Sequence, residues 1–215
     1  MPRLRQVPRS EVKDDVVRGA YDRLFGPERD PVSNPGTATG TPGNWWTVFA
    51  LSPQVFRHAV AGFSLYQKSA DRLPPQLREL AQTRAGYLVG SQFVYSQHCK
   101  SLRAVGVSED KIKAVACWTI SNVFDEVERA VLAYADALAG SNGRVDDRVF
   151  NVLKAHLDDE QILDLTYITA MYAMHAVISR ALRLEYDDVD ERITEIAAPS
   201  GAEGRDVGAD ISGSA

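Results

Sequence analysis

Apolar residues recur three or four positions apart over most of this chain, which is the spacing of one face of an α-helix. No segment shows the sustained alternation of apolar and polar residues that indicates a half-buried strand. Serine or aspartate precedes many of the apolar runs, and glycine follows several, as expected of helix caps. We therefore predict an all-α fold, a helical bundle of about eight or nine helices. The expected helices begin near Ser10, Ser52, Leu73, Ser91, Ser108, Phe124, Asp146 and Asp158.

Two stretches depart from the helical pattern. Residues 26–44 are rich in glycine, proline, serine and threonine and predict a long loop, which is a kind of segment that is often functional or disordered. Trp45 and Trp46 follow directly; they either fill the core, which we favour, or form the aromatic end of a lid over a pocket. Residues 197–215 have almost no large apolar side chains, so we expect a disordered tail after a single domain over residues 1–196.

Composition argues against several classes of function. The net charge is −5, and no basic stripe is present, which argues against a nucleic-acid partner. No uninterrupted apolar run reaches the roughly 18 residues of a membrane span, and the first residues lack the apolar segment of a secretory signal. The two cysteines, Cys99 and Cys117, match no zinc pattern and cannot build a disulfide framework. We expect a cytoplasmic protein with no membrane partner and no bound metal.

Two residues of the central stretch are candidates for catalysis. His98 lies in the middle of a predicted helix, on one face with Ser91 and Tyr95. Histidine exchanges a proton near neutral pH and can act as a general acid or base. The alternative is a core histidine that donates to a backbone carbonyl. Glu79 is the second candidate; its alternatives are a surface glutamate or an ion-pair partner of a nearby arginine such as Arg78.

The positions of these candidates on their helices suggest that they meet. His98 lies seven residues after the break at Gly90-Ser91, which is about 10 Å along its helix, and Glu79 lies eleven residues before it, about 16 Å along the other. Helices joined by a short connection tend to pack antiparallel or sharply angled. We therefore expect both side chains to face one pocket, with Tyr95 and Ser91 nearby.

The block from Leu73 to Ile112 resembles the core motif of the alkylhydroperoxidase D and carboxymuconolactone decarboxylase superfamily. Arg78-Glu79-Leu80 and Arg84 match the first part of that motif, His98 its histidine, and residues 104–109 its last part. The resemblance implies an alkylhydroperoxidase D-like bundle assembled as a homo-oligomer, a trimer or a hexamer. It also implies a proton relay between Glu79 and His98 that acts on a small-molecule substrate without a cofactor.

The chain departs from this pattern at the family's cysteine pair. Ser91 occupies the first cysteine position and Val94 the second. A hydroxyl and an apolar side chain cannot form the thiol–disulfide cycle of a dithiol peroxidase, which is therefore disfavoured. Cys99 is the alternative thiol, but it follows His98 directly and so points about 100° away around the helix. We prefer to interpret it as a buried structural thiol.

The favoured function is that of a carboxymuconolactone decarboxylase-like lyase, with cofactor-free acid–base chemistry on a small organic acid or lactone. His98 would move the proton and Glu79 would orient or relay it. Arg180 is the option for holding a substrate carboxylate, because its guanidinium can bind bidentately. For the neighbouring His175, packing is favoured over a place in the pocket wall. An alkylhydroperoxidase-type antioxidant protein and a family member lacking catalysis remain as alternatives. The expected substrate-binding residues are Ser91, Val94, Tyr95 and Arg180.

Overall fold

The computed structural model describes residues 1–65, 72–190 and 193–205, and in these residues every regular element is a helix. The all-α prediction is confirmed. Two short 3-10 segments, Arg9–Glu11 and Val115–Ile120, accompany the α-helices. The α-helices are α1 (Asp15–Phe25), α2 (Asn44–Phe49), α3 (Pro53–Phe63), α5 (Pro75–Val89), α6 (Gln92–Ala104), α7 (Glu109–Ala114), α8 (Glu126–Gly140), α9 (Asp147–His156) and α10 (Asp159–Leu182).

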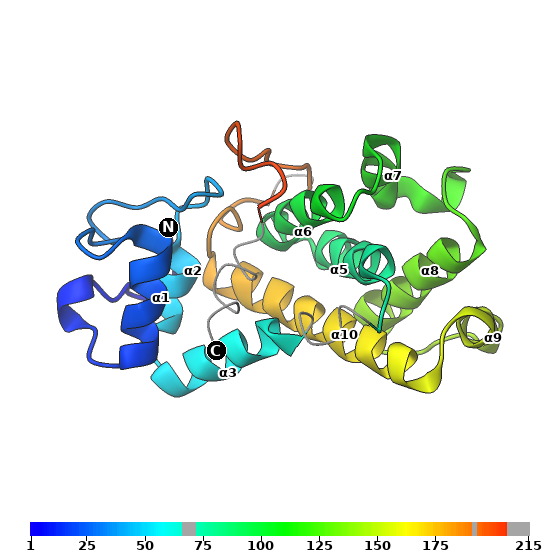
Figure 1. Ribbon diagram of the computed structural model, residues 1–215, viewed down its shortest axis with the longest axis horizontal. Coiled ribbons are helices and arrows are strands. Elements are labelled where there is room, and N and C mark those ends of the chain that lie inside the picture. The colour runs from blue at the N-terminus through cyan, green and yellow to red at the C-terminus, as the bar shows by residue number, and fades with distance from the viewer. Residues whose placement is uncertain (66–71, 191–192, 206–215) are drawn as a thin grey trace.

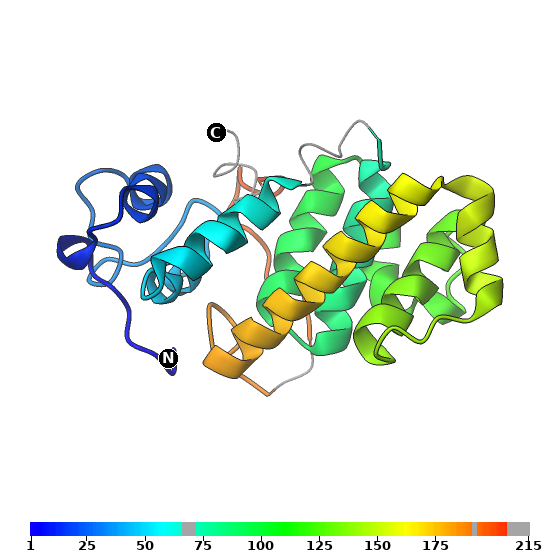
Figure 2. The ribbon, with the colours of Figure 1, turned by 90° about the horizontal axis from the view of Figure 1, so that it is seen from below.

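The elements form an elongated molecule in which α1 to α3 lie at one end and α7 to α9 at the other (Figure 1). Between them, α5 packs against α6, α8 and α10. The long helix α10 runs diagonally past α3 and the central helices, as the view from below shows (Figure 2). The candidate residues of α5 and α6 therefore lie at the centre of the molecule.

The buried apolar side chains form two clusters rather than one. The first joins α1, α2 and α3 to the C-terminal half of α10, and the second joins α5, α7, α8 and α9 to its N-terminal part. Met171 and Ala176 belong to the first cluster, whereas Ile162 and Leu165 belong to the second. By length and composition alone α10 could cross a membrane, but 50% of its most apolar window is buried in the fold, as in a core helix.

The turn between α5 and α6 sets the two helices against each other. Gly90 has a φ of 80°, the left-handed conformation that ends helices, and the Ser91 N–H donates to the Gly86 carbonyl (3.0 Å). The predicted break at Gly90-Ser91 is thus confirmed. At Gly86 the helices approach so closely that a Cβ would lie 2.9 Å from both the backbone nitrogen of Tyr95 and Cγ1 of Val94.

We predict that Gly86→Ala destabilises the protein by about 1–3 kcal/mol, because the added methyl group meets backbone and cannot be accommodated by a rotamer change. Gly19→Ala is the matched control. Gly19 is also helical, but its Cβ would meet only the flexible end of Arg23 at 3.5 Å, so alanine should stabilise α1 by about 0.5–1 kcal/mol. Urea denaturation of both variants measures the difference; equal free energies of unfolding would contradict the close approach.

Some predicted boundaries differ from the observed ones. Ser10 does not cap a long helix; α1 begins at Asp15, because the Asp14 carboxylate accepts hydrogen bonds from the Val16 and Val17 N–H groups. A carboxylate binds these unsatisfied N–H groups more strongly than a hydroxyl does. The helix from Ser52 was expected to reach about residue 69, but α3 ends at Phe63, and residues 66–69 lie outside the described residues.

The chain crosses α6 just before the expected tail. The N–H of Ile196 donates to the Ser96 hydroxyl (2.9 Å). Further along, Ala202, which follows the turn at Gly201, is buried. The disorder expected of residues 197–215 stays a prediction. The remaining residues of the expected tail, 206–215, lie outside the described residues.

Candidate active site

Glu79 and His98 meet between α5 and α6, as their positions along the two helices predicted. Oε2 of Glu79 lies 2.8 Å from Nδ1 of His98. Both residues are buried, with exposed fractions of 1% and 3%. The contact is therefore shielded from water, and a shielded hydrogen bond of this kind is strong and orienting.

The Glu79 carboxylate divides its two oxygens between two partners. Oε1 accepts from Nε and Nη2 of Arg78 (3.1 and 3.0 Å), so the guanidinium balances the buried negative charge. The amide of Gln82, with its nitrogen turned toward the carboxylate, adds a contact of 3.2 Å to the same oxygen. Oε2 contacts Nδ1 of His98 and also lies 3.3 Å from this Gln82 nitrogen. The alternative that Glu79 is an ion-pair partner of Arg78 is thus correct as well, and the two roles are compatible.

The carboxylate also fixes the tautomer of His98. A carboxylate can only accept, so Nδ1 of the imidazole carries the hydrogen and donates it. In the neutral ring Nε2 is then the basic nitrogen. The edge of the Tyr172 ring packs against the imidazole, with the two ring centres 4.3 Å apart. His98 is therefore held in one orientation by α5 and α10 together.

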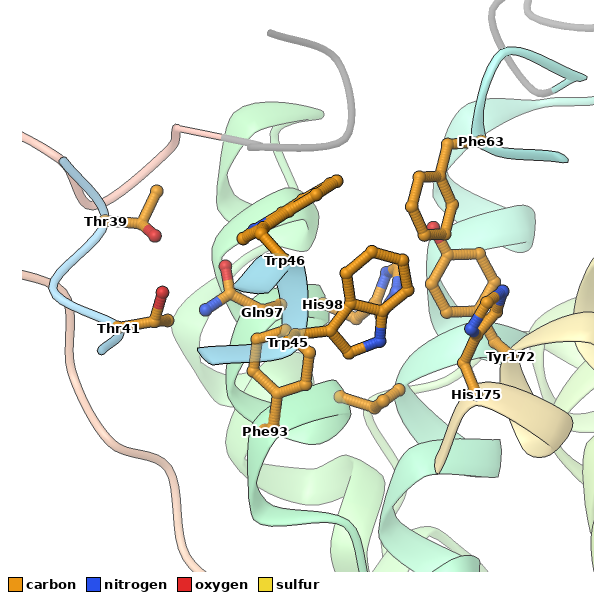
Figure 3. A pocket seen from close by; sticks show the side chains of 11 residues that line it. Thr39, Thr41, Trp45, Trp46, Phe63, Phe93, Gln97, His98, Tyr172 and His175 are labelled. Carbon is orange, nitrogen blue, oxygen red and sulfur yellow. The ribbon is translucent and has the colours of Figure 1, made fainter. Parts of the chain in front are cut away.

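His98 forms part of the wall of a cavity of about 60 Å³. Figure 3 shows the side chains that line this cavity, with Trp45 and Trp46 of α2 in the middle of the view and Tyr172 and His175 of α10 at the right. Glu79 does not line it and lies behind His98. The aromatic side chains that line it are Trp45, Trp46, Phe63, Phe93 and Tyr172.

The segment that contains Glu79 and His98 is similar to known proteins. Residues 54–137, which include Glu79 and His98, match the Carboxymuconolactone decarboxylase family. A solved protein of unknown function from Agrobacterium tumefaciens, a candidate antioxidant defence protein AhpD, is 28% identical and has a TM-score of 0.58 over 68% of this chain and 96% of that one. Residues 54–137 thus form a carboxymuconolactone decarboxylase family domain, and the resemblance to the carboxymuconolactone decarboxylase and alkylhydroperoxidase D superfamily is confirmed.

The chain is also similar to a curated protein and to a second solved structure. Uncharacterized protein YnjA of Escherichia coli (strain K12) is 26% identical over 147 residues, which are 66% of this chain and 76% of that protein. A variant of the debrominase Bmp8, solved in complex with 2,3,4-tribromopyrrole, has a TM-score of 0.64 and 18% identity over 86% of this chain and 92% of that one. At that identity, the likeness to Bmp8 shows the fold alone.

Four residues were expected to bind the substrate, and only one of them, Val94, lines the cavity. The Ser91 hydroxyl donates to Oδ2 of Asp187 (2.6 Å) and accepts from the Val94 N–H, so it caps α6 instead. Arg180 donates to the Val189 carbonyl (2.9 Å) at a separate surface groove. Ser91 and Arg180 therefore do not line the cavity that contains His98, and their contacts with a substrate stay a prediction.

Tyr95 was also expected near His98, and it faces elsewhere. Its ring packs against Tyr87, with centres 5.5 Å apart, in the second apolar cluster. Helix α6 is covered on two sides, so Val94 and His98 face the cavity whereas Tyr95 and Cys99 face that cluster. The helical spacing predicts a single buried face of α6, on which Tyr95 would lie beside His98, whereas two faces of α6 are buried.

The two cysteines, Cys99 and Cys117, do not form a dithiol centre. Cys99 is fully buried, Cys117 is exposed, and both are free. Burial raises the pKa of the Cys99 thiol well above its ordinary range, so the thiol stays protonated and unreactive at neutral pH. Cys99 is thus a structural thiol, as the sequence suggested.

Several aromatic residues and His175 line the cavity although the sequence did not identify them as site residues. Trp45 and Trp46 are buried, as the favoured core interpretation required, and they also line the cavity. His175 was assigned to packing, yet it lines the cavity too, on the same helix as Tyr172. The spacing of Tyr172, His175 and Ser179 at i, i+3 and i+7 was the available signal, because it places polar groups on one inward face of α10.

Proposed function

We propose that this protein is an acid–base enzyme that moves a proton on a small organic molecule through His98. The observation that supports this most strongly is the Glu79–His98 contact at the wall of an aromatic cavity. It leaves Nε2 as the basic nitrogen of a residue that contacts the occupant of the cavity. Glu79 acts through His98 and is a positioning residue.

In the proposed chemistry His98 serves as both base and acid. With an uncharged lactone or enol, Nε2 takes a proton from a carbon or oxygen beside the carbonyl and returns it to another atom of the same molecule. With a carboxylic acid that enters uncharged, Nε2 takes the carboxyl proton, the bond to the carboxyl carbon breaks and carbon dioxide leaves. The protonated His98 then returns the same proton to the remaining carbanion. In both reactions the Glu79 carboxylate stabilises the imidazolium.

The peroxidase alternative has less support. Ser91 and Val94 stand at the two cysteine positions, and the buried Cys99 neither lines the cavity nor has an accessible thiolate. The name of the Agrobacterium relative refers to antioxidant defence, but this chain lacks the thiol pair for that chemistry. Carboxymuconolactone decarboxylase-type chemistry therefore ranks first.

The experiment that tests the proposal is a substrate screen with mass detection. Small lactones, unsaturated lactone acids and ring compounds, including the bromopyrrole class bound by Bmp8, are incubated with the protein and with His98→Ala. We expect a product, by isomerisation or loss of carbon dioxide, with the unaltered protein only. Equal product formation by His98→Ala would contradict the proposal.

We also propose that the chain forms a homo-oligomer through the outer face of α10. Large apolar side chains are exposed there in one stripe, which is uncommon on a monomer surface. The groove beside the stripe is mainly apolar and is shared with α3. A second copy of the chain would cover it. The exposed side chains of the stripe are Leu163, Tyr167, Met174 and Val177, at 67%, 53%, 45% and 55%.

We predict by light scattering an assembly larger than a monomer, with a trimer or hexamer as the expected size. The double substitution Tyr167→Glu and Met174→Glu should dissociate it, because two charges would then be buried without partners. Ile120→Glu is the matched control, since Ile120 is an exposed apolar residue (85%) that belongs to the 3-10 segment Val115–Ile120 and not to the stripe on α10. A monomeric unaltered protein at micromolar concentration would contradict the proposal.

A further inference from the structure

The wall of the cavity has polar groups but no fixed positive charge. Among the described residues that line it, the polar ones are Thr39, Thr41, Gln97, His98 and His175, and none is lysine or arginine. Two cationic side chains near the cavity are already engaged: Arg78 is paired with Glu79 behind His98, and the buried Lys100 donates to the backbone carbonyl of Thr39 (3.1 Å). A carboxylate placed here would have to compete with these partners for a cation, and burying an unpaired ion is strongly unfavourable.

His175 brings an unused hydrogen-bonding group to this cavity. It is 4% exposed, and neither ring nitrogen has a hydrogen-bond partner in the described part of the chain. A buried polar group without a partner costs about 1–3 kcal/mol, so such a group calls for an explanation. A ligand in the cavity would provide the missing partner.

The protonation state of His175 limits what that ligand can be. Burial lowers the pKa of His175 to about 4, and the positive charges that His58 and His98 can carry act in the same direction. At neutral pH the ring is therefore uncharged, with one nitrogen that donates and one that accepts. It can bind a hydroxyl or a ring N–H, but it cannot neutralise an anion.

The rest of the wall favours a flat ring. Trp45, Phe63 and Tyr172 surround His175, with ring centres 5.9, 5.1 and 5.9 Å from its own, and Figure 3 shows these side chains converging on one space. Aromatic side chains contact a flat ring through their faces and edges at such distances. The volume of about 60 Å³ is below the roughly 150 Å³ of a cavity that holds benzene, so a six-membered ring must displace part of the wall.

We infer that the cavity binds a small, uncharged aromatic or heteroaromatic ring that carries a hydroxyl or ring N–H, with His175 as its hydrogen-bond partner. The ring lies against the tryptophans of α2 and presents an edge to Nε2 of His98. Only this last contact rests on the proposed function, since binding itself requires no proton transfer.

Calorimetric titration with three probes tests this inference. Phenol is the uncharged hydroxyl probe, and benzamide and benzoate are a pair of equal size that differ in charge. We expect phenol to bind with millimolar or better affinity and benzamide to bind at least tenfold more tightly than benzoate. His175→Phe, which keeps a buried ring but removes both nitrogens, should weaken phenol binding at least tenfold. His156→Phe replaces an exposed histidine and should leave binding unchanged.

Three results would overturn the inference: benzoate binding as tightly as benzamide, no binding of either uncharged probe at millimolar concentration, or phenol binding that His175→Phe does not change. If His175→Phe fails to fold, two-bond nitrogen–proton NMR spectra of the unaltered protein decide. Phenol must then shift the ring nitrogens of His175 and not those of His156. Phenol binding through His175 without turnover in the substrate screen would contradict the proposed function alone.

Discussion

Replacing His98 with alanine is expected to lower kcat/KM by about 10²–10⁴-fold, the usual contribution of a positioned general acid or base. Among the described residues, His98 is the only ionisable residue that both contacts Glu79 through a hydrogen bond and lines the cavity. Added imidazole should restore part of the activity of His98→Ala. Such rescue is not expected if His98 only fills space.

Glu79→Gln should lower activity by a comparable factor for a different reason. An amide can present either its oxygen or its nitrogen to Nδ1, so His98 would no longer be held in the tautomer that leaves Nε2 basic; the corresponding change in serine proteases costs about 10⁴-fold. The change also removes the buried ion pair between Arg78 and Glu79, which destabilises the protein by about 3–5 kcal/mol. Activity must therefore be measured well below the unfolding temperature.

Two control variants separate these effects. Glu128→Gln also removes a buried carboxylate from an ion pair, with Lys111, but on α8 and away from the cavity, so it should lose stability and keep activity. Cys99→Ser should keep activity as well. Loss of activity in Cys99→Ser, with the fold intact, would favour the thiol-based alternative over proton transfer.

A second large effect is expected from Glu185, whose replacement by glutamine should remove part of the pH dependence of stability. The buried Glu185 carboxylate accepts hydrogen bonds from the N–H groups of Gly43 (2.8 Å) and Trp45 (2.7 Å), at the start of α2. Burial raises the pKa of Glu185 from its ordinary value of 4.5 to about 7, although these hydrogen bonds act in the opposite direction.

The sign of the effect follows from proton binding. Between pH 4.5 and about 7 the folded protein binds more protons at Glu185 than the unfolded chain does, so the free energy of unfolding falls as pH rises. The total is about 3 kcal/mol, from 1.36 kcal/mol for each pKa unit. Titration of His175 instead makes the free energy of unfolding rise with pH, because its pKa is lowered in the folded protein. His175 is present in both proteins, so its contribution cancels in the comparison.

Urea denaturation near pH 5 and near pH 8 measures this difference. The unaltered protein should lose about 2.5 kcal/mol more than Glu185→Gln between the two conditions, because part of the titration lies below pH 5. Glu28→Gln is the control, since Glu28 is exposed, and its pH dependence should follow that of the unaltered protein. Parallel pH dependences for the unaltered protein and Glu185→Gln would show that Glu185 is not titrating as described.

Local signals in the sequence were sufficient for the central pair. The glycine at position 90 requires a left-handed turn, the turn makes α5 and α6 antiparallel, and the number of residues on each side places Glu79 beside His98. Every step depends on residues that are close in sequence, which is why the pairing could be predicted without knowledge of the rest of the fold.

The other site residues depend on contacts that no local pattern contains. Ser91 looked available for a ligand, but its partner Asp187 lies 96 residues later in the chain. Arg180 is engaged by the segment that follows α10, and the cavity joins a loop and α2 to residues of α6 and α10. The role of His175 could not be recognised before the helices around it were placed.

The division of the apolar interior into two clusters has a consequence for how a ligand enters. Trp45 and Trp46 belong to the first cluster, whereas the helix that carries Glu79 contributes to the second through Leu77 and Leu80. Local unfolding commonly involves one such unit at a time, at a lower free energy than global unfolding. The end of the molecule that contains α1 to α3 can therefore loosen and expose the cavity while the hydrogen bond between Glu79 and His98 persists. We therefore expect a ligand to enter by local unfolding of this end, while α5 and α6 keep the proton-transfer geometry.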